Sequence, residues 1–214
     1  MYMRNDITED YPSSWNKEEF KNITSFQQKM NYANQRLEKL ATGSGRAVFK
    51  IDDQKALKIA KNKKGLAQNN IESEPHTQNY DITAHTYDVG EVVKGIGPFW
   101  VEMELAKKLT PSKFKQLTGL THITYSNYLF YLSLKNRFKN KDYELDVFSN
   151  RREIENNQFV QDIIRFADDY DMVYGDLRRL SSYGVVYRAG NEKIVLVDYG
   201  LTTQVHDDYY KVKF

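Results

Sequence analysis

The segment LVDYGLT, residues 196–202, places a carboxylate directly after a run of residues that is typical of a buried strand. Asp198 ends this run, and a tyrosine and a glycine follow it. Burying an unpaired carboxylate is costly, so a fold that contains this strand must bring a metal ion or a basic side chain to the strand end. The segment therefore predicts a site of function or charge pairing at Asp198.

Two β-hairpins are predicted, one on each side of a mostly helical stretch. The first has strands near 46–51 and 55–60, and the second turns at residues 189–192. A short helix that ends near Pro75 follows the first hairpin, and TAHTYDVGEVVKG and PFWVEMELA are strand-like. Residues 112–172 are predicted to be mostly helical. Strands and helices grouped in this way indicate an α+β fold.

Residues 16–40 are predicted to form one amphipathic helix. Asn16 and Glu19 have the spacing of a capping box. Apolar residues repeat at intervals of three and four along the segment: Ile23, Phe26, Met30, Ala33, Leu37 and Leu40. The stripe is shorter than the roughly three to four heptads of a coiled coil. Docking onto the rest of the domain is therefore favoured, with a partner helix as the alternative.

The composition limits the kinds of protein that the chain can be. It has 214 residues, no cysteine and a formal net charge of +2, which suits one domain or a domain in two lobes. Without cysteine there is no disulfide, thiol nucleophile or thiolate metal site, as is typical of a reducing compartment. Because no run of about 18 apolar residues is present, we expect a cytoplasmic protein without membrane contact.

The basic segment KNKKG, residues 61–65, and the histidines are weaker signals. The balanced net charge argues against a broad phosphate-binding face, so KNKKG is interpreted as a solvated loop and nucleic acid is not an expected partner. The histidines lack metal-ligand spacing, so no zinc site is predicted. They are His76, His85, His122 and His206.

A glycine turn precedes the first strand of the first hairpin. Gly43, Ser44 and Gly45 form this turn, and the missing side chains of glycine allow backbone N–H groups to approach a phosphate. An ordinary turn between a helix and a strand is the simpler interpretation. The turn is therefore a candidate phosphate contact that needs support from other residues.

Lys58 is a sharper candidate on the second strand of this hairpin. Strand alternation places it on one face with Ala56 and Ala60. The face is either the solvated side of a half-buried strand or the lining of a cleft. In a cleft the ammonium group needs a carboxylate or a phosphate, and Glu72 on the following helix is the expected carboxylate.

Two carboxylates are expected to converge across the second hairpin. Asp176, in YGDLRRLSSYGVV, precedes this hairpin, and Asp198 ends its second strand 22 residues later. Because a hairpin returns the chain close to its start, the two side chains can share one site. Such a pair can hold Mg²⁺ and orient a hydroxyl group.

In this order, the segments resemble the motifs of a protein-kinase-like fold. The glycine turn resembles the loop over the ATP phosphates, KALK the strand with the phosphate-binding lysine, and VEMELA the hinge between the lobes. YGDLRR is similar to the catalytic loop, and DYG to the D-F-G motif. The resemblance implies that Lys58 contacts the α- and β-phosphates, that Asp176 is the catalytic base and that Asp198 binds Mg²⁺.

The resemblance also assigns the remaining positions of a nucleotide site. Glu72 corresponds to the carboxylate that pairs with the lysine, and Arg178 stands where the family usually has a lysine that stabilises the transferred charge. Ser181 stands at the position of a second metal ligand. The adenine ring is expected to contact four further residues: Ala56, Met103 at the gatekeeper position, and the backbone of Glu104 and Leu105 in the hinge.

The resemblance covers residues 41–202 and implies a two-lobed architecture. It predicts an N-terminal helical extension at residues 1–40, a small antiparallel-sheet N-lobe at 41–105 and a minimal, mostly helical C-lobe at 106–214. Within the fold, the segments look most like the short kinase-like proteins of tailed bacteriophages, which implies the cytoplasm of a bacterial host.

Several positions depart from the family pattern. The glycine turn lacks a third glycine. Tyr174-Gly175 stands in place of the His-Arg of protein kinases, so that the segment resembles the H-G-D motif of small-molecule kinases more than the H-R-D motif. A serine replaces the metal-binding asparagine: Ser181, or Ser182 if the loop is one residue longer. Only 14 residues follow Gly200, so the expected C-lobe is truncated.

Two classes of function follow from these observations. In the first, the protein is a phosphotransferase that uses Mg-ATP and transfers phosphate to a hydroxyl group on a protein or small molecule, with AMP transfer as a variant. In the second, it is a pseudokinase-like module that binds a partner protein with or without nucleotide. A second copy of the chain that completes the short C-lobe is a further alternative.

Overall fold

The computed structural model describes residues 12, 14–137 and 151–211. It confirms the α+β class, and the chain divides into two compact units. The first unit comprises Met1–Asn69 and Thr86–Leu105, and the second comprises Asn70–His85 and Ala106–Phe214. Part of the predicted helical stretch, at residues 138–150, lies outside the described residues.

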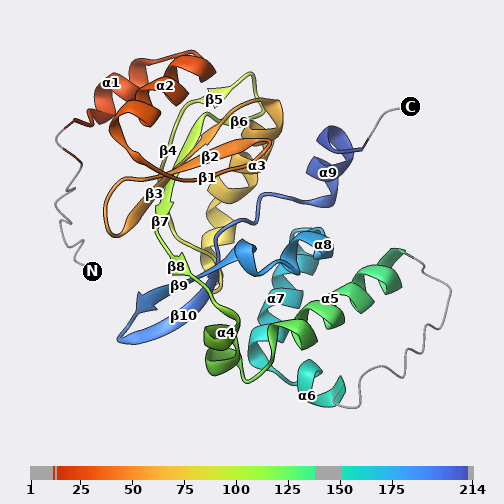
Figure 1. Ribbon diagram of the computed structural model, residues 1–214. Helices are drawn as coiled ribbons and strands as arrows, with labels where there is room; N and C mark the ends of the chain where they lie inside the picture. Colours follow the sequence, from red (N-terminus) through yellow and green to blue (C-terminus); the bar gives the residue numbers. More distant parts are fainter. Residues whose placement is uncertain (1–11, 13, 138–150, 212–214) are drawn as a thin grey trace, which may run out of the picture. The chain divides into compact units, whose positions relative to one another are not determined.

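The first unit is built from a sheet, with two helices that precede it in the chain (Figure 1). Its elements are α1 (Lys17–Asn22), α2 (Phe26–Arg36), β1 (Glu38–Thr42), β2 (Arg46–Lys50), β3 (Lys55–Ala60), the first part of α3 (Lys63–Ser73), β4 (Thr86–Val89), β5 (Val92–Val93), β6 (Gly97–Pro98) and β7 (Trp100–Glu104). Five of the strands form one antiparallel sheet in the order β1-β2-β3-β7-β4. The predicted first hairpin is confirmed as β2–β3.

The prediction of a single helix over residues 16–40 is wrong. Its predicted N-cap is confirmed, because the Asn16 side chain accepts the Glu19 N–H at 3.0 Å. However, α1 ends at Asn22, and Ser25 caps a separate helix, α2. The residues that follow form β1 and pair with β2, which leaves Leu40 42% exposed. The apolar spacing that predicted a helix there is overridden because strand pairing satisfies the same backbone groups.

The two N-terminal helices pack on one face of the five-stranded sheet (Figure 1). Phe20 of α1 lies 5.9 Å from the ring of Trp100 on β7, and both side chains are buried. The core of this layer comprises Trp15, Phe20, Tyr32, Ala33, Leu37, Ala47, Phe49, Ile51, Leu57, Ile59, Phe99 and Trp100. Ala33 and Leu37 of the predicted apolar stripe belong to this core, and Ile23, Phe26 and Met30 pack against it. The predicted docking of the stripe is therefore confirmed except at Leu40, which is exposed.

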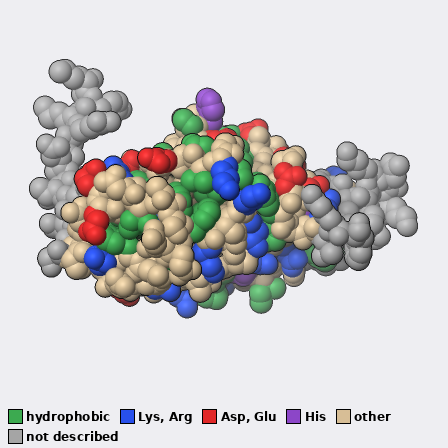
Figure 2. All heavy atoms as spheres, turned by 90° about the horizontal axis from the view of Figure 1, so that it is seen from above, with side chains coloured by type: hydrophobic (Ala, Val, Ile, Leu, Met, Phe, Trp, Pro, Cys, Tyr) green, Lys and Arg blue, Asp and Glu red, His purple; other side chains and the backbone are tan. Residues whose placement is uncertain are grey.

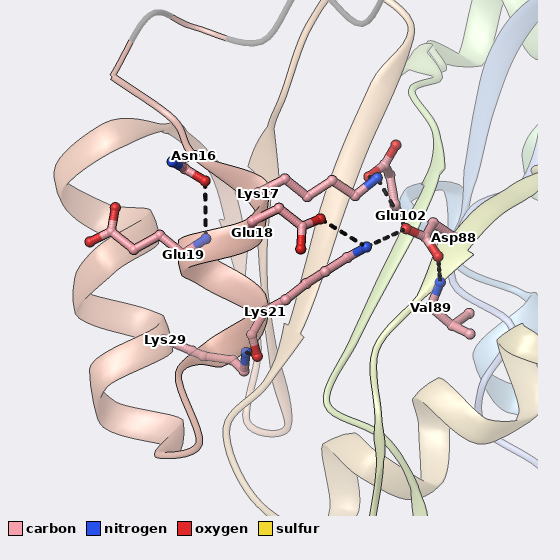
Figure 3. A network of polar contacts seen from close by, with 9 residues as sticks. All are labelled: Asn16, Lys17, Glu18, Glu19, Lys21, Lys29, Asp88, Val89 and Glu102. Atoms are coloured by element: carbon pink, nitrogen blue, oxygen red, sulfur yellow. Dashed lines mark hydrogen bonds and ion pairs between the residues drawn. The ribbon is translucent and has the colours of Figure 1, made fainter.

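Ion pairs join α1 to the sheet (Figure 3). Lys17 Nζ lies 3.0 Å from both Asp88 Oδ2 on β4 and Glu102 Oε2 on β7. Lys55 Nζ lies 3.5 Å from the other oxygen of Glu102, whose side chain is 2% exposed. A buried carboxylate needs such partners, so these pairs fix α1 against its face of the sheet.

The second unit contains most of the helices and a small sheet (Figure 1). Its elements are the end of α3, η1 (Pro75–Asn79), β8 (Lys107–Lys108), α4 (Pro111–Thr118), α5 (His122–Arg137), α6 (Arg151–Glu155), α7 (Gln158–Asp169), α8 (Tyr174–Leu177), η2 (Leu180–Ser182), β9 (Tyr183–Arg188), β10 (Asn191–Leu196) and α9 (Thr203–Tyr209). The strands pair in the order β10-β9-β8. The second predicted hairpin is thus confirmed as β9–β10, with Ala189 and Gly190 at positive φ in its turn.

Gly65 in α3 is expected to resist replacement by alanine, although alanine is the better helix former. A Cβ at Gly65 would lie 2.1 Å from the carbonyl oxygen of Gly45. The gain in helix propensity is about 1 kcal/mol, whereas overpacking costs roughly 1–3 kcal/mol or more. We therefore expect Gly65→Ala to lower the midpoint of thermal unfolding. Gly43→Ala is the control, because its Cβ would lie 3.9 Å from the nearest atom. A higher midpoint for Gly65→Ala would contradict the close contact.

Large apolar side chains reach the surface on several different elements. The space-filling view shows apolar groups interspersed with lysine and arginine side chains (Figure 2). The large apolar residues that are exposed are Leu40, Tyr87, Val89, Val92, Ile123, Phe130, Tyr187 and Tyr210.

None of the helices in the described part of the chain has the length and apolar character needed to cross a bilayer.

Candidate active site

Lys58 lies on a buried face of the sheet in the first unit. It pairs with Val48 on β2 and Val101 on β7, and the residue is 4% exposed. Its side chain points away from Leu57, which belongs to the core under α1 and α2. The alternative of a solvated strand face is therefore wrong for Lys58. A buried ammonium group requires polar partners, which is consistent with a role beyond strand formation.

The residues predicted to contact adenine lie beside Lys58 on the same face. Ala56 pairs directly with Met103 of β7 in the antiparallel ladder, and paired residues point to the same side of a sheet. Both residues are buried, at 5% and 1% exposure. Glu104 ends β7, and the Leu105 N–H donates to the Gln54 carbonyl at 2.7 Å. The first unit thus brings together Lys58, Ala56 and Met103.

The glycine turn connects β1 to β2 in the same unit. The Gly43 N–H donates to the Arg46 carbonyl at 2.8 Å, which closes the turn. Gly43 and Ser44 are exposed, whereas Gly45 is buried against Gly65. The turn therefore presents its first two residues to solvent and anchors its third.

In the second unit, Glu72 and the DYG segment are in direct contact. The Glu72 carboxylate accepts the Tyr199 N–H at 3.1 Å, and both residues are fully buried. The Tyr199 hydroxyl lies 3.3 Å from the carbonyls of Glu72 and Ala84, to which it donates, and it accepts from Gln78 Nε2 at 3.2 Å. These contacts fix the residue next to Asp198. The predicted pairing of Glu72 with Lys58 involves the other unit and stays a prediction.

Ser182 links the backbones of Asp176, the predicted base, and Asp198, the predicted metal ligand. Its hydroxyl donates to the Asp176 carbonyl at 3.0 Å. Its own carbonyl accepts the N–H groups of Val197 at 2.9 Å and Asp198 at 3.3 Å. The predicted convergence of Asp176 and Asp198 thus has a physical basis within the second unit, through a serine that is 3% exposed.

Side chains hold three successive carbonyls of the loop that carries Asp176. Besides the Ser182 contact, the Tyr183 hydroxyl donates to the Leu177 carbonyl at 2.8 Å. His122 Nε2 lies 3.0 Å from the Arg178 carbonyl and donates to it, because a carbonyl only accepts. Tyr183 also shares a hydrogen bond with Tyr125, and burial raises the pKa of both phenols. Three side chains thus fix the backbone of this loop through its carbonyl groups.

The two arginines of the loop have different partners. Arg178 Nε donates to the Ser126 carbonyl at 3.0 Å, and its guanidinium lies 4.4 Å from the centre of the Phe130 ring. Arg179 Nη1 instead lies 3.5 Å from Asp176 Oδ1. The arginine predicted from the resemblance is thus held by α5, whereas the neighbouring arginine, which the motif did not indicate, pairs with the candidate base.

The structure also distinguishes the two serines that were considered as a metal ligand. Ser181 is exposed, whereas Ser182, the alternative for a longer loop, is buried between the two aspartates. Among the described residues, no group of three or more His, Cys, Asp or Glu side chains is arranged to hold a metal ion. Mg²⁺ commonly uses only one or two protein carboxylates and takes its other oxygens from phosphates and water. Asp198, the predicted metal ligand, fits that requirement by donor type.

Comparison with protein families and with curated proteins finds no match. No protein-family model matches the chain, and no curated protein matches it significantly.

Proposed function

We propose that the two units correspond to the lobes of a protein-kinase-like fold and that the chain is a Mg-ATP-dependent phosphotransferase. Lys58, supported by Glu72, binds the α- and β-phosphates, and Ala56, Met103 and the hinge backbone bind adenine. Asp176 orients an acceptor hydroxyl on a protein or small molecule and takes its proton. Asp198 holds Mg²⁺, which neutralises phosphate charge when bound.

The single observation that carries this proposal is the link between Asp176 and Asp198 through Ser182. One buried serine bonds to the carbonyl of the first aspartate and to the N–H of the second. Phosphoryl transfer needs a carboxylate at the acceptor hydroxyl and a metal-binding carboxylate close to it. The hydrogen bonds through Ser182 hold the backbones of the two acidic residues in one small region, as a base and a metal ligand at one site would require.

Glu72 and Tyr199 support the same assignment. Burying a carboxylate is costly unless it accepts hydrogen bonds, and Glu72 accepts one from the residue that directly follows Asp198. Any displacement of α3 would therefore disturb the position of Asp198. This contact gives Glu72 a role in ordering the metal ligand, in addition to its proposed pairing with Lys58.

Arg179 is proposed to keep Asp176 in place between turnovers. Its guanidinium lies 3.5 Å from the carboxylate, and its side chain is 70% exposed. The Asp176 side chain is only 15% exposed. Because the arginine is largely solvated, it can move away from the carboxylate and leave room for an acceptor hydroxyl. Arg178, which is held by Ser126, positions the loop backbone.

Thermal unfolding with and without Mg-ATP tests the proposal. At about one hundred times its dissociation constant, a ligand adds roughly 2.7 kcal/mol to the free energy of unfolding. For a chain of this size, the midpoint then rises by about 5–10 °C. Asp198→Asn should lose the magnesium-dependent part of this rise. The control is Asp208→Asn, which removes an exposed carboxylate on α9 and should retain the full rise.

Transfer itself is then followed with ATP labelled at the γ- or the α-phosphate. Incorporation of γ-label that Lys58→Met abolishes supports the phosphotransferase, whereas incorporation of α-label indicates AMP transfer. No midpoint shift at saturating Mg-ATP would overturn the proposal. The pseudokinase-like interaction module would then become the preferred interpretation.

A further inference from the structure

The basic segment KNKKG, residues 61–65, is attached to the glycine turn. Lys61 Nζ donates to the Gly43 carbonyl at 2.9 Å, and Asn62 Nδ2 donates to the Ser44 carbonyl at 3.0 Å. The backbone N–H of Lys61 donates to the Gly45 carbonyl at 2.7 Å. All three carbonyls of the turn are therefore held by two consecutive residues, Lys61 and Asn62.

This arrangement determines where the N–H groups of the turn point. In a trans peptide unit, the carbonyl of one residue and the N–H of the next point in opposite directions. With the Gly43 and Ser44 carbonyls bound by the basic segment, the N–H groups of Ser44 and Gly45 point away from it. Within the described part of the chain, neither N–H donates a hydrogen bond. Two adjacent N–H groups in a turn can together bind an anion.

The positive charge of the basic segment also favours binding of an anion at the turn. Lys64 Nζ donates to Ser44 Oγ at 2.7 Å, which leaves the hydroxyl proton of Ser44 able to donate elsewhere. An ammonium group bound to a carbonyl polarises the peptide unit and strengthens the N–H on its other side as a donor. The segment can thus influence an anion at the turn without touching that anion.

We propose that Lys61 and Asn62 are positioning residues that set the conformation of the glycine turn for the terminal phosphates of the nucleotide. This inference rests on the proposed function. It explains how a turn with only two glycines is ordered: side chains from residues 61 and 62 fix its carbonyls. It also replaces the interpretation of KNKKG as a merely solvated loop.

The test compares the affinities of single variants for ATP and for adenosine. Lys61→Met and Asn62→Ala should each weaken Mg-ATP binding about five- to tenfold, as expected for loss of one hydrogen bond that acts on a charged ligand. Adenosine binding should stay unchanged, because adenosine has no phosphate. Lys61→Arg should restore most of the ATP affinity. A variant that only damages the fold would weaken the binding of both ligands.

Lys63→Met is the matched control. Lys63 is exposed on the same segment, and within the described residues it makes no hydrogen bond or ion pair with the turn. Its replacement removes the same charge and should leave ATP affinity within about twofold, because screened surface charges contribute little. If Lys63→Met and Lys61→Met weaken ATP binding equally, the effect is general electrostatics and the positioning role is overturned.

A second probe distinguishes failure of this inference from failure of the proposed function. Inorganic tripolyphosphate, measured by competition and by thermal shift, reports phosphate binding without adenine. If the wild-type chain binds ATP and the Lys61→Met and Asn62→Ala variants bind it equally well, the positioning role is overturned. The proposed function is not affected by that result. A wild-type chain that binds neither ATP nor tripolyphosphate overturns both. Tripolyphosphate binding that Lys61→Met weakens supports the positioning role even if no transfer is found.

Discussion

Asp176→Asn is expected to lower the turnover number by about 10²–10⁴-fold, the usual contribution of a positioned general base. The amide cannot take the proton of the acceptor hydroxyl, whereas it keeps the shape of the carboxylate. The affinity for Mg-ATP should change little, because the proposed nucleotide contacts lie elsewhere. Initial rates at saturating ATP, together with a direct binding measurement, separate these two effects.

The fold should tolerate Asp176→Asn. The Asp176 side chain is 15% exposed, but asparagine has nearly the same shape and keeps an acceptor oxygen, so the change should cost about 1–2 kcal/mol of unfolding free energy. Arg179→Met tests the partner and should reduce turnover far less than Asp176→Asn does. A turnover number for Asp176→Asn within about threefold of wild type, far below the contribution of a general base, would exclude Asp176 as the base. Asp208→Asn is again the control for an exposed carboxylate.

Tyr199→Ala is expected to lower the free energy of unfolding by about 3–5 kcal/mol, as for other fully buried aromatic residues. Tyr199 is 0% exposed, and its ring meets that of Phe166 edge-on, with 5.8 Å between the centroids. The midpoint of thermal unfolding should therefore fall by on the order of 10 °C. Chemical denaturation gives the free energy directly.

Two variants divide the effect of Tyr199→Ala into its parts. Tyr199→Phe keeps the ring and loses only the hydroxyl contacts with Gln78, Glu72 and Ala84, so it should cost about 1–2 kcal/mol. Tyr187→Ala removes a tyrosine that is 73% exposed and should change stability by no more than about 0.5 kcal/mol. Equal effects of Tyr199→Ala and Tyr187→Ala would contradict the packing described for Tyr199.

Local patterns were predicted well because their causes are local. The strands of both hairpins follow from alternation and turn residues, and the N-cap at Asn16 follows from a hydrogen bond that spans three residues. The prediction of a helix at residues 38–42 is wrong because the structure there depends on a distant segment. An apolar spacing compatible with a helix does not show that β2 is available as a pairing partner.

The sequence predicted which residues belong to the candidate site, but it predicted only part of how they are arranged. Asp176 and Asp198 were expected to converge, but Ser182, which links them, was only the second choice for its position. Arg178 was chosen from the motif, although Arg179 is the arginine beside Asp176. Adjacent residues of one loop point in different directions, and the packing against α5 determines which of them faces the carboxylate.

By itself, the sequence determined the α+β class, the two hairpins and the chemical types placed at each strand end, because periodicity, capping and turn formation act over a few residues. The tertiary structure decided which groups meet. Glu72 binds the backbone of Tyr199 across 127 residues, and Lys61 binds Gly43 across 18. Such contacts depend on the path of the whole chain and on the need of buried polar groups for partners, which no local pattern encodes.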